Sequence, residues 1–233
     1  MFYTKKYIIS PHDCDKDKII KLDRLCSKMS ITEFHQVKSD AFYKEYLEIE
    51  NLFVVLTYRY FKIYELPKIN TEITVSTGVY YINQIIGYRT TSIRDTAGKL
   101  LVMSYVEGVF VDIENHFLRR VSKDALKKAI LYPCQDIELP LKPNIDNLSF
   151  EYVGKRKVLS SYVDEFNHMN NAKYLAVTNK YVKTNVKEVS IVYKKEALVD
   201  DILKIYKYQD SKEIVIKIEN INKDILCILR YII

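Results

Sequence analysis

The chain has 233 residues, 48% of them hydrophobic, and a formal net charge of +6 at pH 7. That length allows one large or two smaller domains, and only five glycines and five prolines argue against a disordered chain. The charge is modest and forms no basic run, which argues against nucleic acid, and no apolar stretch approaches the roughly 18 residues that span a membrane.

In chain order, the first half reads as a strand, a long helix and four more strands. The first strand is expected at Tyr3–Ser10. In the helix that follows, apolar residues recur at helical spacing at Leu22, Leu25, Cys26 and Met29. We expect it to continue, with a break, through Phe42–Tyr46. Branched and aromatic residues predict strands at Leu52–Tyr64, Thr71–Tyr80, Ile85–Arg94 and Leu100–Ile113. Asp95–Gly98 is typical of a turn, and Ser122 is placed to cap a short helix that ends near Leu131.

The hydrophobic periodicity is lost after this half, and then the same order of strands and helix recurs. Residues 133–149 contain three prolines and little periodicity, so we interpret them as a linker between domains at residues 1–132 and 150–233. A strand at Tyr152–Leu159 and a helix at Ala172–Val182 come next. The last strands are expected at Glu188–Lys195, Ile202–Tyr208, Glu213–Glu219 and Ile225–Ile232. One helix must then cover the apolar face of each sheet, which predicts a tandem α+β repeat. We expect the two sheets of this repeat to join edge to edge.

The two halves differ where they are aligned. Matching Asp15 with Asp164 puts Ile19 opposite His168, and matching the next strands puts Pro67 opposite Glu196. The first half therefore lacks the polar groups of the second. We expect chemistry in the second half, and an enclosed apolar ligand beside the longer helical segment of the first.

Polar residues gather between the expected strand and helix of the second half: Asp164, Asn167, His168, Asn170 and Asn171. Either asparagine at the helix start suits an N-cap. A carboxylate and an imidazole would then lie beside the positive end of a helix, which stabilises developing negative charge. These residues alone leave a second interpretation open, a helix cap with a surface histidine.

The cysteines and the residues around His12 suggest no metal centre. The four cysteines are far apart and form no CxxC pair, so we expect neither a zinc site nor a disulfide frame. The run His12–Asp15 has ligand types but no second ligand cluster, and a polar loop is the simpler interpretation.

Over nearly its whole length the chain resembles the acyl-acyl-carrier-protein thioesterases of plants and bacteria, and the second half carries the most specific motif. Their motif Asp-x-Asn-x-His-Val-Asn-Asn-x-x-Tyr is matched by Asp164, His168, Asn170, Asn171 and Tyr174, and their aromatic-basic-basic-Glu pattern by Tyr193 to Glu196. In the first half Arg59, Arg89, the Asp95–Gly98 turn and Arg119-Arg120 are also similar. The resemblance implies an α+β fold of two tandem hotdog domains, each a curled antiparallel sheet around a helix. It also implies hydrolysis of the thioester between a fatty acyl chain and acyl carrier protein.

The resemblance also implies roles for residues. Glu196 would be the base that activates water, His168 with Asp164 the polar pair at the substrate carbonyl, and N–H groups near Asn170 and Asn171 would hold the oxyanion. The acyl pocket would involve Leu25, Met29 and Phe34. The substrate carries its own phosphopantetheine, so no cofactor is expected. The partner would be acyl carrier protein, whose approach a mildly positive surface would favour; hotdog domains often pair, which leaves a homodimer open.

Two positions depart from the family. Phe166 replaces the asparagine that precedes the histidine by two positions, and Asn167 is the candidate to substitute for it. Ala197 stands where many plant members have a cysteine, so a covalent thiol route through that position is excluded and direct attack by water is favoured.

Two other functions remain open. One is an acyl-coenzyme A thioesterase, and the other is a non-catalytic hotdog module that binds acyl chains, which Phe166 would favour. The first ten residues already read as a strand rather than a signal peptide. We therefore expect a cytoplasmic protein, made in a bacterium.

Overall fold

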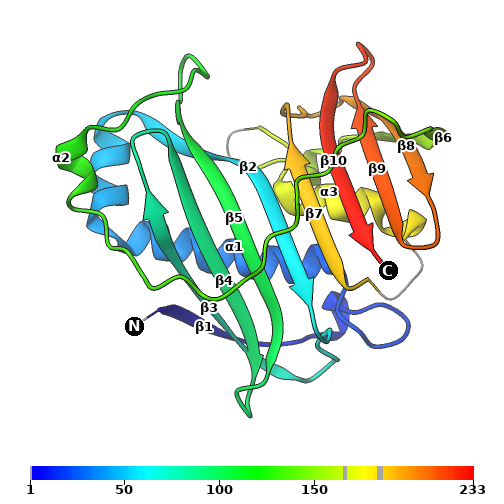
Figure 1. Cartoon of the computed structure of the whole chain (residues 1–233), viewed down its shortest axis with the longest axis horizontal. Coiled ribbons are helices and arrows are strands. Elements are labelled where there is room, and N and C mark those ends of the chain that lie inside the picture. The colour runs from blue at the N-terminus through cyan, green and yellow to red at the C-terminus, as the bar shows by residue number, and fades with distance from the viewer. Residues whose placement is uncertain (1, 165–166, 183–185) are drawn as a thin grey trace.

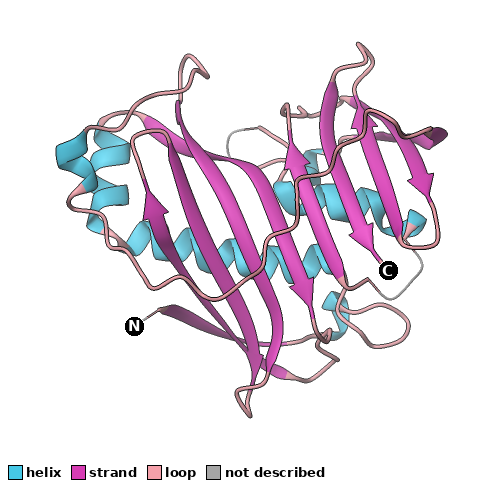
Figure 2. Cartoon of the chain, viewed as in Figure 1, coloured by secondary structure: helices cyan, strands magenta, loops and turns pink. Residues whose placement is uncertain are grey.

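The structure, a computed structural model, describes residues 2–164, 167–182 and 186–233. The strands in these ranges form one ten-stranded sheet. Each strand in it runs antiparallel to its neighbours. The two core helices, α1 (Leu22–Ser39) and α3 (Asn171–Thr178), lie on the same face of this sheet (Figure 1). The layered α+β arrangement agrees with the expectation from the repeat (Figure 2).

The first half of the chain forms half of the sheet. Its strands are β1 (Tyr3–Ile8), β2 (Leu52–Ile63), β3 (Glu72–Ile82), β4 (Ile86–Asp95) and β5 (Leu100–Asp112). Short helical segments are η1 (Pro11–Asp13), η2 (Phe42–Leu47) and α2 (Lys123–Leu126). The expected break in the long helix lies at Asp40, whose side chain accepts the N–H of Phe42 at 3.0 Å and starts a π-helical segment.

The second half repeats this order with shorter elements. Its strands are β6 (Glu151–Lys157), β7 (Glu188–Tyr193), β8 (Ile202–Gln209), β9 (Glu213–Glu219) and β10 (Ile225–Ile232). The segments η3 (Ser160–Tyr162) and η4 (Asn179–Tyr181) are 3-10 helices. The helix expected to reach Val182 is therefore α-helical only to Thr178.

The two half-sheets join through their second and seventh strands. The strand order is β1-β3-β4-β5-β2-β7-β10-β9-β8-β6, which places equivalent strands symmetrically about the β2–β7 pair. In that pair Tyr58 lies opposite Val192 and Lys62 opposite Glu188. The two halves therefore form one continuous sheet, as the repeat predicted.

One apolar cluster lies between this sheet and both core helices. It contains Leu25 and Met29 from α1, Leu175 from α3, and strand residues of both halves such as Val75 and Ile216. Burial of such side chains is worth about 1.5–3 kcal/mol each. Since both helices contribute to one cluster, the halves share their main source of stability.

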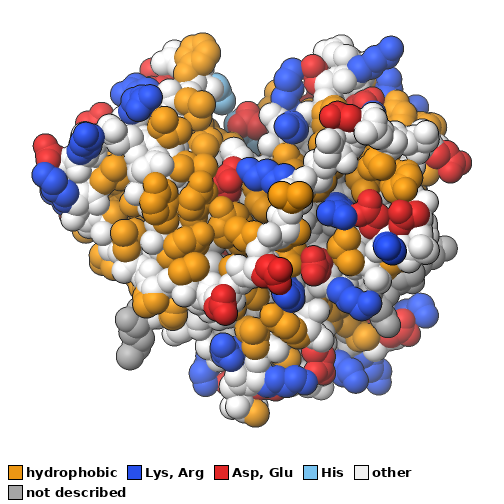
Figure 3. Space-filling view, in the orientation of Figure 1, with side chains coloured by type: hydrophobic (Ala, Val, Ile, Leu, Met, Phe, Trp, Pro, Cys, Tyr) orange, Lys and Arg blue, Asp and Glu red, His pale blue; other side chains and the backbone are white. Residues whose placement is uncertain are grey.

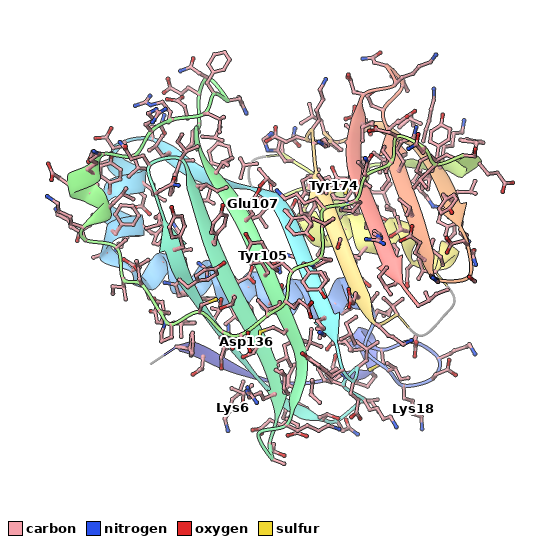
Figure 4. The ribbon with its side chains drawn as sticks, in the orientation of Figure 1. Lys6, Lys18, Tyr105, Glu107, Asp136 and Tyr174 are labelled. Carbon is pink, nitrogen blue, oxygen red and sulfur yellow. The ribbon has the colours of Figure 1, made fainter. Side chains whose placement is uncertain are left out.

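Residues 133–149 cross the outer face of the sheet (Figure 1). Ile137 and Ile145 pack against a tyrosine-rich cluster that includes Tyr105, and the ammonium of Lys142 binds the Glu107 carboxylate at 2.7 Å. Figure 4 shows Tyr105 and Glu107 on β5 beside this segment. Figure 3 shows hydrophobic side chains still exposed on this face, over the first half of the sheet. No helix in the described ranges combines the length and the apolarity needed to cross a membrane.

Candidate active site

The backbone on both sides of His168 is held in a tight loop. The N–H of Asp164 donates to the His168 carbonyl at 2.9 Å, and the N–H of His168 donates to the Asp164 carboxylate at 3.3 Å. The next residue ties the loop to the second half of the sheet, since the N–H of Met169 donates to the Ala197 carbonyl at 2.8 Å. These bonds place His168 beside the segment that follows β7.

His168 and Glu196, which the resemblance assigns to one site, lie in direct contact. The His168 Nε2 and Glu196 Oε2 atoms are 3.1 Å apart, and the two side chains are 17% and 38% exposed. The neighbouring Lys195 binds Asp224 at 2.8 Å. A partly exposed carboxylate thus keeps access to water while a histidine fixes its position.

The two asparagines at the start of α3 have different environments. The Asn170 side chain accepts the N–H of Ala172 at 3.0 Å and is the N-cap. This confirms the helix-capping role expected for this pair. Asn171 is the first residue of the helix and lines a cavity beside His168.

This cavity has a volume of about 590 Å³ and holds the predicted polar groups on its wall. Asp164, His168, Asn171 and Glu196 line it together with apolar residues of β2 such as Val55. The histidine and the carboxylate therefore face a space large enough for a water and part of a small ligand.

A second cavity, of about 410 Å³, adjoins the first and extends along α1 and η2. The two cavities share Phe53, Asp164 and Asn171 as wall residues. Phe34 lines the second cavity as expected. The expectation for Leu25 and Met29 is wrong, because both pack in the core between the helices and the sheet and neither is among its described walls. They lie on the face of α1 that meets α3, whereas the cavity follows the later turns of α1.

A buried polar network closes the second cavity. Arg59 is fully buried and binds the Glu33 carboxylate at 2.5 Å, while Thr91 donates to the same carboxylate at 2.8 Å. Burial alone would raise the pKa of Glu33, but the charges of Arg59 and Arg89 and these hydrogen bonds outweigh it and hold that pKa below its ordinary value. Glu33 is therefore an ionised carboxylate within a buried polar network on the wall of the second cavity.

The equivalent loop of the first half has the same backbone hydrogen bonds but lacks the histidine and the glutamate. Asp15 donates its N–H to the Ile19 carbonyl at 2.8 Å, as Asp164 does to His168, which confirms the alignment of Ile19 with His168. The alignment of Pro67 with Glu196 is wrong by one position. The N–H of Ile20 donates to Pro67 as that of Met169 donates to Ala197, so Leu66 is the residue opposite Glu196. Leu66 is apolar, so the conclusion about the first half still holds.

Asn167 occupies an exposed turn rather than a cavity wall. Its φ is 62°, and Lys18 has φ 63° at the same place in the first half. Asn167 is not among the described residues that line either cavity. The family departure at Phe166 lies outside the described residues.

One residue near the site was missed by the sequence reasoning. His116, in the loop after β5, has its Nδ1 3.9 Å from Glu196 Oε2 and its ring centroid 5.8 Å from that of His168. It comes from the other half of the chain, so no local spacing could have indicated it. The side chains of the run His12–Asp15 have separate environments. Asp13 binds Lys28 at 2.9 Å, and Cys14 is buried.

Comparisons with known proteins agree with this architecture. The sequence profile of the acyl-ACP thioesterase N-terminal domain matches residues 1–129. No curated protein matches the chain.

Three solved structures align over nearly the whole chain. An acyl-ACP thioesterase from Bacteroides thetaiotaomicron has a TM-score of 0.85 at 16% identity and covers 98% of this chain and 96% of its own. A putative oleoyl thioesterase from Lactobacillus plantarum has a TM-score of 0.82 at 15% identity, covering 99% and 95%. The 12:0-ACP thioesterase from Umbellularia californica has a TM-score of 0.81 at 14% identity, covering 98% and 95%. At these identities the structures establish the fold, two tandem hotdog domains, and the profile establishes the family. Since that profile covers more than half of its 233 residues, this chain belongs to the acyl-ACP thioesterase family and is a thioester hydrolase.

Proposed function

We propose that this protein hydrolyses fatty acyl-acyl carrier protein, releases a free fatty acid and thereby ends chain elongation, with Glu196 as the general base. The observation that carries the proposal is the 3.1 Å contact between Glu196 and His168 on the wall of a cavity that adjoins a second one lined largely by apolar residues. A thioesterase needs this combination, since its substrate has a long apolar tail and a single reactive carbonyl.

In the proposed reaction Glu196 takes a proton from a water in the 590 Å³ cavity. The water oxygen attacks the thioester carbonyl carbon and forms a tetrahedral oxyanion. His168 and the backbone N–H of Asn171, a residue on the cavity wall, stabilise that oxyanion, the latter helped by the partial positive charge of the helix terminus. The carbon–sulfur bond then breaks, and the proton held by Glu196 passes to the departing phosphopantetheine thiolate. The products are a carboxylic acid and a thiol.

Asp164 and Asn170 have positioning roles in this proposal. The Asp164 carboxylate accepts the backbone N–H of His168, and Asn170 caps the helix that begins with Asn171. Each keeps a reacting group in place without transferring a proton. The side chain of Ala197 is buried and has no nucleophile, which is consistent with direct attack by water.

In this proposal the two halves of the chain have different roles. Residues 1–132 hold the acyl chain in the cavity along α1, residues 150–233 carry the catalytic groups, and residues 133–149 connect them across the sheet. Acyl carrier protein is the proposed partner.

The test compares purified wild-type protein with Glu196→Gln on acyl-acyl carrier protein and acyl-coenzyme A. Removing a general base costs on the order of 10²–10⁴-fold in rate, so we expect kcat to fall in that range while the melting temperature is unchanged. Glu65→Gln is the matched control, because Glu65 follows β2 as Glu196 follows β7 but is bound to Lys99 far from the cavity.

Two outcomes would contradict the proposal. Full activity in Glu196→Gln would remove Glu196 from the mechanism. Turnover of acyl-coenzyme A as efficient as that of the carrier-protein substrate would overturn the assignment of the partner and leave thioester hydrolysis in place.

A further inference from the structure

His116, His168 and Glu196 converge on one point from two halves of the chain. The His168 Nε2 is 3.1 Å and the His116 Nδ1 3.9 Å from the same Glu196 oxygen, and the three ligand atoms all lie within 4.8 Å of one another. All three residues line the 590 Å³ cavity. We propose that they form a Zn²⁺ site, and that the metal inhibits the enzyme by engaging Glu196 and His168.

The spacing suits a tetrahedral zinc ion. Zinc lies 2.0–2.2 Å from nitrogen and oxygen ligands, so two ligand atoms of a tetrahedral site are about 3.3–3.6 Å apart. The three separations in the site bracket that range. The widest pair has to close by no more than about 1.2 Å, which rotation of the His116 side chain, 54% exposed, can supply.

The donor set also selects zinc among common divalent ions. Two imidazoles and one carboxylate are a typical three-ligand zinc set that leaves a fourth position to water, whereas Mg²⁺ and Ca²⁺ prefer oxygen ligands. The charges nearby permit a cation. Two lysines and two carboxylates line the cavity: Lys194, Lys195, Asp164 and Glu196. The Lys195 ammonium is already bound to Asp224, so the carboxylates offset the remaining positive charge of Lys194.

The loop that carries His116 is ordered before any metal binds. The Asp112 carboxylate accepts the N–H groups of Glu114 and Asn115 at 3.0 Å and binds Arg119 at 2.7 Å. The N–H of His116 donates to the Asp112 carbonyl at 3.0 Å. These contacts hold His116 at φ 57° over the cavity, so little ordering accompanies metal binding.

The inhibitory effect rests on the proposed function, whereas the binding does not. A zinc-bound Glu196 cannot accept a proton from water, and a zinc-bound His168 cannot donate to the oxyanion. We therefore expect hydrolysis to stop in proportion to the occupancy of the site.

The first experiment measures metal binding alone, by calorimetry with Zn²⁺ and by the visible absorption of tetrahedral Co²⁺. It uses full-length protein in which the exposed thiol is removed by Cys134→Ser, since the other three cysteines are buried. We expect one site per chain. Loss of a residue that only hydrogen-bonds to a metal ligand typically lowers metal affinity by about 10–100-fold. His116→Ala removes a ligand itself, so it should weaken binding by at least about 100-fold. His12→Ala and His35→Ala are matched controls, because both remove an exposed histidine elsewhere; they should bind as the parent does.

The second experiment adds Zn²⁺ to the hydrolysis assay. The parent should lose activity as the site fills. His116→Ala should hydrolyse at the parental rate without metal and resist the same Zn²⁺ concentration. A parent that takes up no Zn²⁺, or a His116→Ala variant that binds equally well, would overturn the proposal. A chain that binds Zn²⁺ through His116 but never hydrolyses thioesters would overturn the proposed function instead.

Discussion

Asn167 illustrates how a residue in the middle of a catalytic loop can have a backbone role. Its φ of 62° lies in the left-handed region, which asparagine tolerates better than most residues. Lys18 adopts the same conformation in the first half, where neither a histidine nor a glutamate is present at the equivalent positions. The conformation is thus a property of the repeated loop and does not depend on the reaction. We infer that Asn167 shapes the turn that presents His168.

Two substitutions separate this role from catalysis. Asn167→Gly keeps the left-handed conformation at no steric cost and should leave kcat close to that of the wild type. Asn167→Ala adds a strained residue and should lower the free energy of unfolding by about 1 kcal/mol. Steady-state kinetics and urea unfolding measure both. A large fall in kcat for the glycine variant, without a change in stability, would return the side chain to the catalytic machinery.

At the scale of elements, α1 is unusual because an ionised glutamate lies on its buried face. Glu33 and Arg59 form an ion pair whose two side chains are 9% and 0% exposed. Removing one partner of such a pair leaves an uncompensated buried charge and costs about 3–5 kcal/mol. The pair therefore specifies how α1 sits on β2, and so the shape of the second cavity.

We expect Glu33→Gln to lower the free energy of unfolding by about 3–5 kcal/mol at neutral pH. The pKa of Glu33 is held below its ordinary value of 4.5. Its contribution is therefore complete above that ordinary value and is lost as the pH falls through the lower pKa of the folded state. The difference between wild type and Glu33→Gln should accordingly shrink in acid.

Chemical denaturation at several pH values measures this difference. Glu48→Gln is the control, because Glu48 and its partner Lys38 are about half exposed and such pairs are worth about 0–1 kcal/mol. A loss below about 1 kcal/mol for Glu33→Gln, equal to that of the control, would show that the buried pair does not stabilise the fold.

The elements themselves were largely predictable from the sequence, because their signals are local. Alternating and branched residues located strands such as β2 and β5 to within a residue or so at each end, and the repeat of element order predicted the joined sheets. Leu25 and Met29 were correctly identified as apolar residues of α1. Periodicity cannot tell, however, whether an apolar residue faces a core or a cavity, and both face the core.

The site was predictable only where one half of the chain supplies it. His168 and Glu196 meet because the loop before α3 pairs with the segment after β7, an arrangement that the resemblance implied. His116 reaches the same cavity only because β2 pairs with β7 and brings the first half alongside. That contact depends on the tertiary fold, so no motif in the sequence indicated it.

At the scale of the whole molecule, the two hotdog halves are not independent. Five residue pairs join β2 to β7, from Tyr58 opposite Val192 to Lys62 opposite Glu188, and the Tyr58 hydroxyl donates to Ser190 at 3.2 Å. Residues 133–149 cross the outer face of the sheet and contact a cluster that contains strand residues of both halves. Separating the halves would expose two sheet edges and divide one apolar core, both of which are costly.

We therefore expect a single cooperative unfolding transition, although the chain contains two repeats. Urea unfolding followed by far-ultraviolet circular dichroism and by tyrosine fluorescence should give the same midpoint, which is the usual test of two-state behaviour. Amide hydrogen exchange gives a sharper version of the test. The central amides of β4 and β9, one strand from each half, should open with the same free energy, because the shared core releases both together. Two separate transitions, or β9 opening well before β4, would show that the pairing of β2 with β7 connects the halves without making them unfold together. In that case the position of Glu196 relative to the cavity in the first half would not be fixed by the fold.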